Sequence, residues 1–235
     1  MRRLQAFVFD LDGTLLDTEI LWVRATEAFL RDRGLDIDAD EVMGIVYGRA
    51  WRDVHAALRA RFPVLAMDLE TMEDAMRPYF LALRDREDIR IPGSIGLLRR
   101  LAASYPVCIV SGSGRRDVAD GIALMQVSDG LSFFLASEDY ERGKPDPACF
   151  LQAAERFGVP PDACMVFEDS AAGIRAAKAA GMHCTALVRK GRPRQNVSAA
   201  DLALSDLADF SVADYEARWA SERDGAARHC DRMTG

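Results

Sequence analysis

The stretch FDLDGT at residues 9–14 closes an apolar run that begins at Ala6, and it sets two carboxylates one residue apart. Residues 6–9 have the composition of a short strand that is buried on both faces of a parallel sheet. In an open α/β sheet the ligand crevice lies beyond the carboxyl ends of the strands, where Asp10 and Asp12 fall. Gly13 permits a tight turn that brings both carboxylates toward one ligand. The stretch therefore predicts a metal site, a nucleophile with a general acid, or both.

This stretch has two other interpretations. Asp and Gly are ordinary turn residues, so a solvated surface turn is the plain alternative. A calcium-binding loop that starts at Asp10 needs an oxygen donor, a glycine and a carboxylate at its fifth, sixth and twelfth positions. Those positions hold Thr14, Leu15 and Leu21, so the calcium loop is excluded.

Length and charge narrow the class of protein. The 235 residues suit one large domain or one domain that carries a smaller insertion. The formal net charge of −7 disfavours nucleic acid and anionic membrane surfaces as partners. No secretory signal is evident, and no apolar run approaches the length of a membrane span. We expect a cytoplasmic protein, a monomer or small homo-oligomer, whose partner is a small molecule.

Apolar runs alternate with helix-like segments over most of the chain, which is typical of a parallel sheet with crossover helices. The sequence therefore predicts an α/β fold with a doubly wound, Rossmann-like core. After the first strand, the expected strands are Val107 to Val110, Phe133 to Ala136, Met165 to Phe167 and Cys184 to Val188. The expected core helices are Ser94 to Ser104, Arg115 to Met125, Pro147 to Phe157 and Ala171 to Ala180.

The segment between Leu16 and about Arg90 has a different pattern, with helical amphipathic stretches and no β-branched runs. We predict an all-helical cap domain at 16–90, inserted into a core domain formed by 1–15 and 91–213. An insertion directly after the first strand lies over the crevice and can act as a lid. A C-terminal tail at 214–235 is expected to be partly disordered. The expected cap helices are Ile20 to Arg33, Asp53 to Phe62 and Leu69 to Arg86.

Polar groups follow further strands of the predicted sheet. Ser111 ends the second strand, and Gly112 leads into a helix whose N-terminal N–H groups can hold an anion. Lys144 lies in a loop fixed by two prolines, and Glu168 and Asp169 end another strand. Each feature alone has an ordinary explanation as a turn, a solvated lysine or a helix cap. Together, at successive strand ends, they predict one site.

In this order the motifs DxDGT, S, KPDP and EDS resemble those of the haloacid dehalogenase-like (HAD) hydrolase superfamily, in the branch with a helical cap. The resemblance extends to about Leu207. By that resemblance Asp10 is the nucleophile that forms an aspartyl phosphate, and Asp12 is the general acid and base. Ser111, Gly112 and Lys144 would bind the phosphoryl oxygens.

The same resemblance implies Mg²⁺ as the cofactor. Its ligands would be Asp10, the Asp12 backbone carbonyl and Asp169, with Glu168 as a further candidate. Mg²⁺ prefers hard carboxylate oxygens, and phosphoryl transfer requires chiefly positioning and neutralisation of charge. The carboxylates at these positions therefore agree with the Mg²⁺-dependent phosphoryl transfer that the resemblance implies.

Several reactions occur within this superfamily, and single residues distinguish them. An acid at Asp12 favours phosphate esters, because halide leaves without a proton. Phosphonatases use a cap lysine, and 16–90 contains none. Trp22 stands where β-phosphoglucomutases place a histidine. We expect a Mg²⁺-dependent phosphohydrolase of small phosphorylated metabolites, similar to sugar-phosphate phosphatases such as 6-phosphogluconate phosphatase. A phosphomutase is the alternative, and a non-catalytic phosphate-binding regulator is a third.

Two arginines of the predicted cap are candidates for binding the substrate. Arg49 and Arg52 lie in GRAWR at residues 48–52, which approximates the glycine-led arginine motif of the related mutases. Cations in this turn could meet an anionic or polyhydroxylated end of the substrate. Solvated residues at the start of a helix are an equally good explanation.

Overall fold

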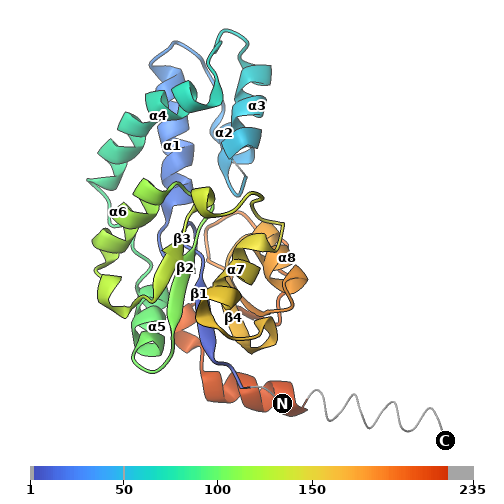
Figure 1. The fold of residues 1–235 in the computed structure, drawn as a ribbon. Helices are drawn as coiled ribbons and strands as arrows, with labels where there is room; N and C mark the ends of the chain where they lie inside the picture. The colour runs from blue at the N-terminus through green and yellow to red at the C-terminus, as the bar shows by residue number, and fades with distance from the viewer. Residues whose placement is uncertain (1–2, 50, 222–235) are drawn as a thin grey trace, which may run out of the picture.

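The computed structural model describes residues 3–49 and 51–221 and contains one parallel sheet of six strands in the order β3-β2-β1-β4-β5-β6 (Figure 1). This order confirms the predicted doubly wound α/β core, because the chain adds strands first on one side of β1 and then on the other. The strands are β1 (Ala6–Phe9), β2 (Val107–Val110), β3 (Phe133–Leu135), β4 (Cys164–Glu168), β5 (His183–Leu187) and β6 (Leu202–Leu204).

Strand β1 lies at the centre of the sheet and pairs with both β2 and β4. Phe7 is in register with Val107 on one side and with Met165 on the other. All four residues of β1 are buried. The topological switch point therefore falls between β1 and β4, and their carboxyl ends define the position at which a ligand is expected.

Helices cover both faces of the sheet. Phe7 and Phe9 pack on one face with α5 (Pro92–Ala102) and α6 (Arg115–Met125). The other face packs against α7 (Ala148–Phe157) and α8 (Ala171–Ala179). Successive side chains of a strand point to opposite faces, so one short apolar strand contributes to two cores.

Four helices before α5 form a separate group with its own apolar core, above the carboxyl ends of the strands (Figure 1). Three of them overlap helices predicted from the amphipathic pattern. The second was not predicted, because it is short and buries only Val42 and Val46. These helices are α1 (Thr18–Arg31), α2 (Ala39–Val46), α3 (Trp51–Arg61) and α4 (Leu69–Arg84).

Ion pairs connect this helical group to the sheet half of the molecule. Asp17, just before α1, accepts hydrogen bonds from Arg189 and Arg192 in the loop after β5. Burial alone would raise the pKa of Asp17, but these two guanidinium groups lower it. On the other side, Arg77 of α4 pairs with Asp117 of α6.

The predicted elements differ from the observed ones mainly at their ends. The helices expected at Pro147 to Phe157 and Ala171 to Ala180 each differ by one residue at one end. Strand β6 was not predicted, because it is short and its outer position leaves it partly exposed. A helix at 212–221 extends into the predicted tail of 214–235, so residues 214–221 are ordered as a helix, and 222–235 lie outside the described residues.

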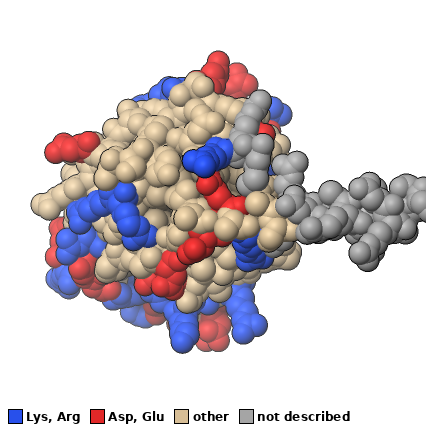
Figure 2. Space-filling model, turned by 90° about the horizontal axis from the view of Figure 1, so that it is seen from below, with Lys and Arg blue, Asp and Glu red and all other residues tan. Residues whose placement is uncertain are grey.

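The face opposite the helical group carries charges of both signs around uncharged surface, with no region of one sign dominating the view (Figure 2). Mixed charge of this kind is typical of a solvated protein surface. None of the described helices combines the length and apolar character that crossing a bilayer requires.

Candidate active site

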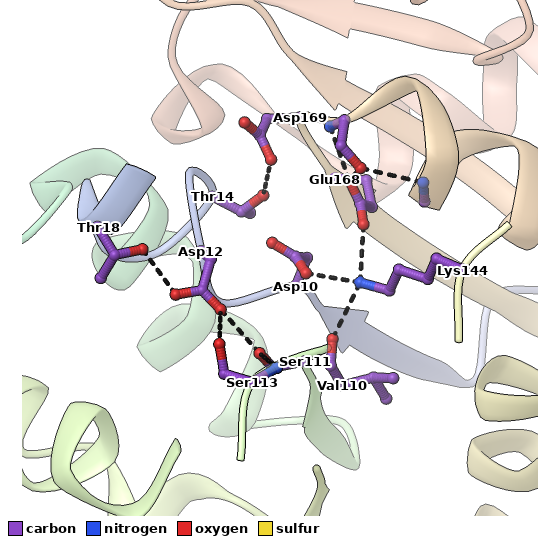
Figure 3. Close-up of polar contacts among 12 residues, drawn as sticks. Asp10, Asp12, Thr14, Thr18, Val110, Ser111, Ser113, Lys144, Glu168 and Asp169 are labelled. Atoms are coloured by element: carbon purple, nitrogen blue, oxygen red, sulfur yellow. Dashed lines mark hydrogen bonds and ion pairs between the residues drawn. The ribbon is translucent and has the colours of Figure 1, made fainter. Parts of the chain in front are cut away.

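The polar residues predicted at the strand ends lie close together (Figure 3). Asp10 follows β1, and its N–H donates to the Phe167 carbonyl of β4 at 2.9 Å. Ser111 follows β2, while Glu168 ends β4 and Asp169 follows it. The parallel sheet gathers these residues because the carboxyl ends of β1, β2 and β4 share one edge.

Lys144 connects two of the carboxylates. Its Nζ donates to Asp10 Oδ1 at 2.6 Å, to Glu168 Oε1 at 2.8 Å and to the Val110 carbonyl at 3.2 Å. Burial alone would lower the pKa of Lys144, but the two carboxylates raise it well above its usual value. This lysine is therefore a fixed positive charge within the cluster.

Asp10 is a buried carboxylate with one engaged and one free oxygen. Burial raises its pKa, Lys144 opposes that shift, and the charges of Glu168 and Asp12 add to it. Asp10 Oδ2 is buried and has no hydrogen-bond partner among the described residues. Buried polar atoms are normally paired, so the free oxygen indicates that a ligand or reactant meets it.

Asp12 is held by three hydroxyl groups. Oδ1 accepts a hydrogen bond from Thr18 Oγ1 at 2.6 Å, and Oδ2 accepts from Ser111 Oγ at 2.8 Å and from Ser113 Oγ at 2.7 Å. Three donors fix the orientation of the carboxylate beside the cluster. Thr18 and Ser113 were not assigned roles from the sequence, because hydroxyl residues in a turn or an early helix give no separate signal.

Three carboxylates are arranged so that they could hold a metal ion. One oxygen each of Asp10, Glu168 and Asp169 lies within 4.8 Å of the others. Burial and the neighbouring acids raise the pKa of Asp169 well above its usual value. A cation would remove this repulsion. The free oxygen of Asp10 and the hard donor set therefore fit a divalent cation such as Mg²⁺.

Glu168 differs from the other two carboxylates because both its oxygens have donors. Lys144 occupies Oε1, and Oε2 accepts from the Ser170 N–H at 2.8 Å and from Ser170 Oγ at 2.9 Å. A Cβ on Gly173 would lie 1.6 Å from Glu168 Oε1, so only glycine fits at that point of α8. Asp10 and Asp169 therefore have more freedom than Glu168 to bind a cation.

Asp169 is positioned by the turn that follows β1. Its Oδ1 accepts a hydrogen bond from Thr14 Oγ1 at 3.2 Å. Gly13 has a φ of +85°, and a Cβ there would lie 2.2 Å from Asp169 Oδ2. The glycine of the DxDGT stretch is thus required both for the turn and for the approach of this carboxylate.

A cavity of about 1270 Å³ lies between the sheet edge and the helical group. Of the residues predicted from the sequence, it is lined by Asp10, Asp12, Arg49, Gly112, Lys144 and Glu168. Ser111 is fully buried behind it, and Asp169 lines a second cavity of about 330 Å³. Arg52 is exposed on α3 and is not among the lining residues.

The sequence pattern of the haloacid dehalogenase-like hydrolase family matches residues 4–181 of this chain. The chain therefore belongs to that family. This confirms the family that the sequence motifs resemble. The fold, the strand-end carboxylates and the lysine agree with that membership.

Individual relatives are phosphatases. The chain is 36% identical over 228 residues to the Drosophila melanogaster protein named "Probable pseudouridine-5′-phosphatase", covering 89% of this chain and 93% of the relative. It is 32% identical over 213 residues to hexitol phosphatase A of Escherichia coli (strain K12), covering 89% and 94%. Among solved structures, β-phosphoglucomutase of Clostridium difficile aligns with a TM-score of 0.75 over 93% of this chain and 98% of that chain. At 21% identity that likeness shows the fold alone.

Proposed function

We propose that this protein is a Mg²⁺-dependent phosphatase of small phosphorylated metabolites, in particular sugar phosphates or sugar-acid phosphates. The observation that carries the proposal is the buried Asp10 carboxylate, with one oxygen on Lys144 and the other free beside Asp169. This arrangement suits a nucleophile that attacks phosphorus and forms an aspartyl phosphate. The phosphatase relatives support the same reaction class.

The surrounding residues divide the work of phosphoryl transfer. Lys144 supplies positive charge next to the attacking carboxylate. Ser111 and the N–H of Gly112 are proposed to bind phosphoryl oxygens at the start of α6. Asp12 would give a proton to the leaving oxygen and then take one from the water that hydrolyses the intermediate. The hydroxyls that hold Asp12 can rotate as it gains or loses this proton.

The proposed ligands of Mg²⁺ are Asp10, Asp169 and the backbone carbonyl of Asp12. Glu168 is proposed to act chiefly by holding Lys144 in place. The bound cation would neutralise charge on the phosphoryl group. Within this chain, Thr14 orients Asp169 and Lys144 holds Asp10, so both carboxylates have fixed positions before substrate arrives.

We also propose that 16–90 acts as a cap over a core formed by 1–15 and 91–213. The cavity between the two parts is large enough for a sugar phosphate, and closure of the cap over it would exclude protein and nucleic-acid substrates. The described cysteines are free and buried, which suits a reducing compartment such as the cytoplasm. A monomer or small homo-oligomer is the proposed state.

A phosphomutase is the alternative, since β-phosphoglucomutase shares the fold. A specific observation favours hydrolysis. Trp22 stands where the related mutases have a histidine. Its ring stacks on that of Phe80 with 4.2 Å between the ring centroids, and both residues line the cavity. No histidine is found among the described residues that line this cavity, so an imidazole that could assist return of the phosphoryl group is lacking there.

The test is phosphate release from p-nitrophenyl phosphate and from a panel of phosphorylated metabolites, with and without Mg²⁺. We expect Mg²⁺-dependent release, with the best metabolite exceeding p-nitrophenyl phosphate in kcat/KM. Incubation with β-glucose 1-phosphate and a trace of its bisphosphate tests the alternative. Efficient formation of glucose 6-phosphate with little free phosphate would establish the mutase instead.

A further inference from the structure

Glu19, in the first turn of α1, is a half-buried acid in the wall of the cavity, and none of the proposed catalytic roles uses it. Its Oε1 accepts a hydrogen bond from the Gly48 N–H at 3.2 Å. Its Oε2 is buried and has no partner within hydrogen-bond distance among the described residues, although the Tyr47 hydroxyl is near enough to lower the pKa of Glu19. An unpaired buried carboxylate oxygen is costly in free energy, so its presence requires an explanation.

The electrostatic surroundings of Glu19 are mostly acidic. Burial and the nearby charge of Asp12 raise its pKa to about 7, while the Tyr47 hydroxyl and the Gly48 N–H partly oppose that shift. Glu168 adds a further weak repulsion. The acidic neighbours make the free oxygen better suited to a neutral hydrogen-bond donor than to an anion.

An aromatic wall lies along the same cavity and consists of Trp22, Trp51 and Phe80. The rings of Trp22 and Phe80 are stacked with 15° between their planes. The ring centroid of Trp51 lies 5.0 Å from that of Trp22. Such rings cover the C–H surface of a carbohydrate, and a carboxylate beside them accepts hydrogen bonds from its hydroxyls.

The position of Glu19 along α1 shows which part of a substrate it would meet. The preceding residue, Thr18, donates its hydroxyl to Asp12. Asp12 is the group proposed to protonate the leaving oxygen. Asp12, Glu19 and the aromatic wall line one cavity, so a leaving group attached to that oxygen would have room to reach Glu19.

We propose that Glu19 is a specificity-determining residue whose Oε2 accepts a hydrogen bond from a hydroxyl of the leaving group, so that polyhydroxylated phosphate esters are selected. The inference deepens the proposed phosphatase function and rests on it. Gly48 holds the other oxygen of Glu19 and so fixes the direction of the free one.

The experiment compares esters that differ in hydroxyl groups. The best substrate from a panel of aldose, ketose and alditol monophosphates is paired with the n-alkyl phosphate of the same carbon number. Glu19→Gln keeps an acceptor for the Gly48 N–H but replaces Oε2 by a group that cannot accept a hydrogen bond. Glu27→Gln is the matched control, because Glu27 lies on the same helix and pairs with Arg31 outside the cavity.

We expect wild-type protein to prefer the polyhydroxylated ester. Glu19→Gln should lower kcat/KM for that ester by about 10- to 100-fold, the range for a hydrogen bond to a charged group. It should change kcat/KM for the n-alkyl ester and for p-nitrophenyl phosphate by no more than about twofold. Glu27→Gln should change neither. Inhibition by inorganic phosphate should be the same in all three proteins, which shows that the phosphoryl site is intact.

The outcomes separate the inference from the function on which it rests. Equal losses on both esters, or no loss on either, would overturn the role of Glu19 while leaving the phosphatase intact. A wild-type protein without preference for the hydroxylated ester would do the same. Glu19→Ala supplies a second variant if Glu19→Gln is unstable, with the same selective loss expected. Absence of phosphate release from every ester by wild-type protein would overturn the proposed function itself.

Discussion

The two walls of the cavity are built in different ways. On the sheet side, Asp10, Asp12 and Lys144 take part in hydrogen bonds of 2.6 to 3.2 Å that originate at strand ends. On the helical side, Glu19 and the stacked rings of Trp22 and Phe80 line the cavity, and one oxygen of Glu19 has no partner within hydrogen-bond distance among the described residues. The sheet wall is organised before any ligand binds, whereas the helical wall has hydrogen-bonding capacity left for a ligand.

This difference separates the reaction from its selectivity. Changes in the sheet wall should lower turnover of every ester, because all substrates share the phosphoryl group. Changes in the helical wall should alter the ranking of esters, because only the leaving group reaches it. The predictions below test this division, from the largest expected effect to the smallest.

Asp10→Asn should lower phosphatase activity by about 10⁴-fold or more on every ester, because the amide keeps the shape of the side chain but cannot attack phosphorus. Circular dichroism should show an unchanged fold. Steady-state rates on p-nitrophenyl phosphate and on the best metabolite provide the measurement. Substantial retained turnover would exclude Asp10 as the nucleophile.

Lys144→Met should lower kcat on all esters by about 10²- to 10³-fold, the usual cost of losing one stabilising group at a transition state. It also leaves Asp10 facing other acids without a buried cation, which costs about 3 kcal/mol of stability at pH 7. The folded-state pKa of Asp10 is already raised. Protonation therefore relieves the loss, and denaturant titrations should show a smaller deficit at pH 5 than at pH 8. An equal deficit at both values would contradict this account.

Mg²⁺ should stabilise the protein more at pH 8 than at pH 5. The folded-state pKa of Asp169 is raised, so the metal-free fold prefers the protonated acid and loses stability as pH rises from about 3.9 through that pKa. Protons compete with the metal at low pH. At 100 times Kd, binding contributes about 2.7 kcal/mol, or roughly 5–10 °C in Tm.

Thermal melts with Mg²⁺ and with a chelator, at both pH values, measure this effect. Asp169→Ala should remove most of the Mg²⁺-dependent shift and serves as the control. A shift of the same size at pH 5 and pH 8 would show that Asp169 does not compete with protons for the metal.

Arg49→Ala should lower kcat/KM for the best metabolite by about 10-fold, equivalent to about 1.4 kcal/mol, and should have less effect on p-nitrophenyl phosphate. Arg52→Ala, the matched control, should have an effect below twofold, because Arg52 is exposed and is not among the residues that line the cavity. Equal effects of the two substitutions would show that lining the cavity does not determine which of the two arginines contacts the substrate.

Much of the fold followed from local patterns. The buried strand at residues 6–9 and the helix Arg115–Met125 were predicted with their observed bounds, because an uninterrupted apolar run and a regular amphipathic period are strong signals. The helix Ala39–Val46 and the strand Leu202–Leu204 were missed. Both are short and partly exposed, so their apolar residues are too few to establish a period.

The residue types of the site could also be predicted, but their hydrogen bonds could not. Ser111 was expected to meet phosphate, and in the structure its hydroxyl donates to Asp12, which is 99 positions away in the sequence. Glu168 was expected near a metal, and its oxygens are engaged by Lys144 and Ser170. Such pairings depend on strand register and loop packing, which no local pattern contains.

The sequence by itself determined that acids, a hydroxyl and a lysine follow the strands of a parallel sheet, because strand periodicity and topology bring those positions to one edge. Tertiary structure alone decided which oxygens are satisfied and which are free. Asp10 Oδ2 and Glu19 Oε2 are left without partners only because distant elements bury them and supply no donor among the described residues. Burial and hydrogen-bond geometry are properties of the packed molecule, so they first appear when the helical group closes over the sheet.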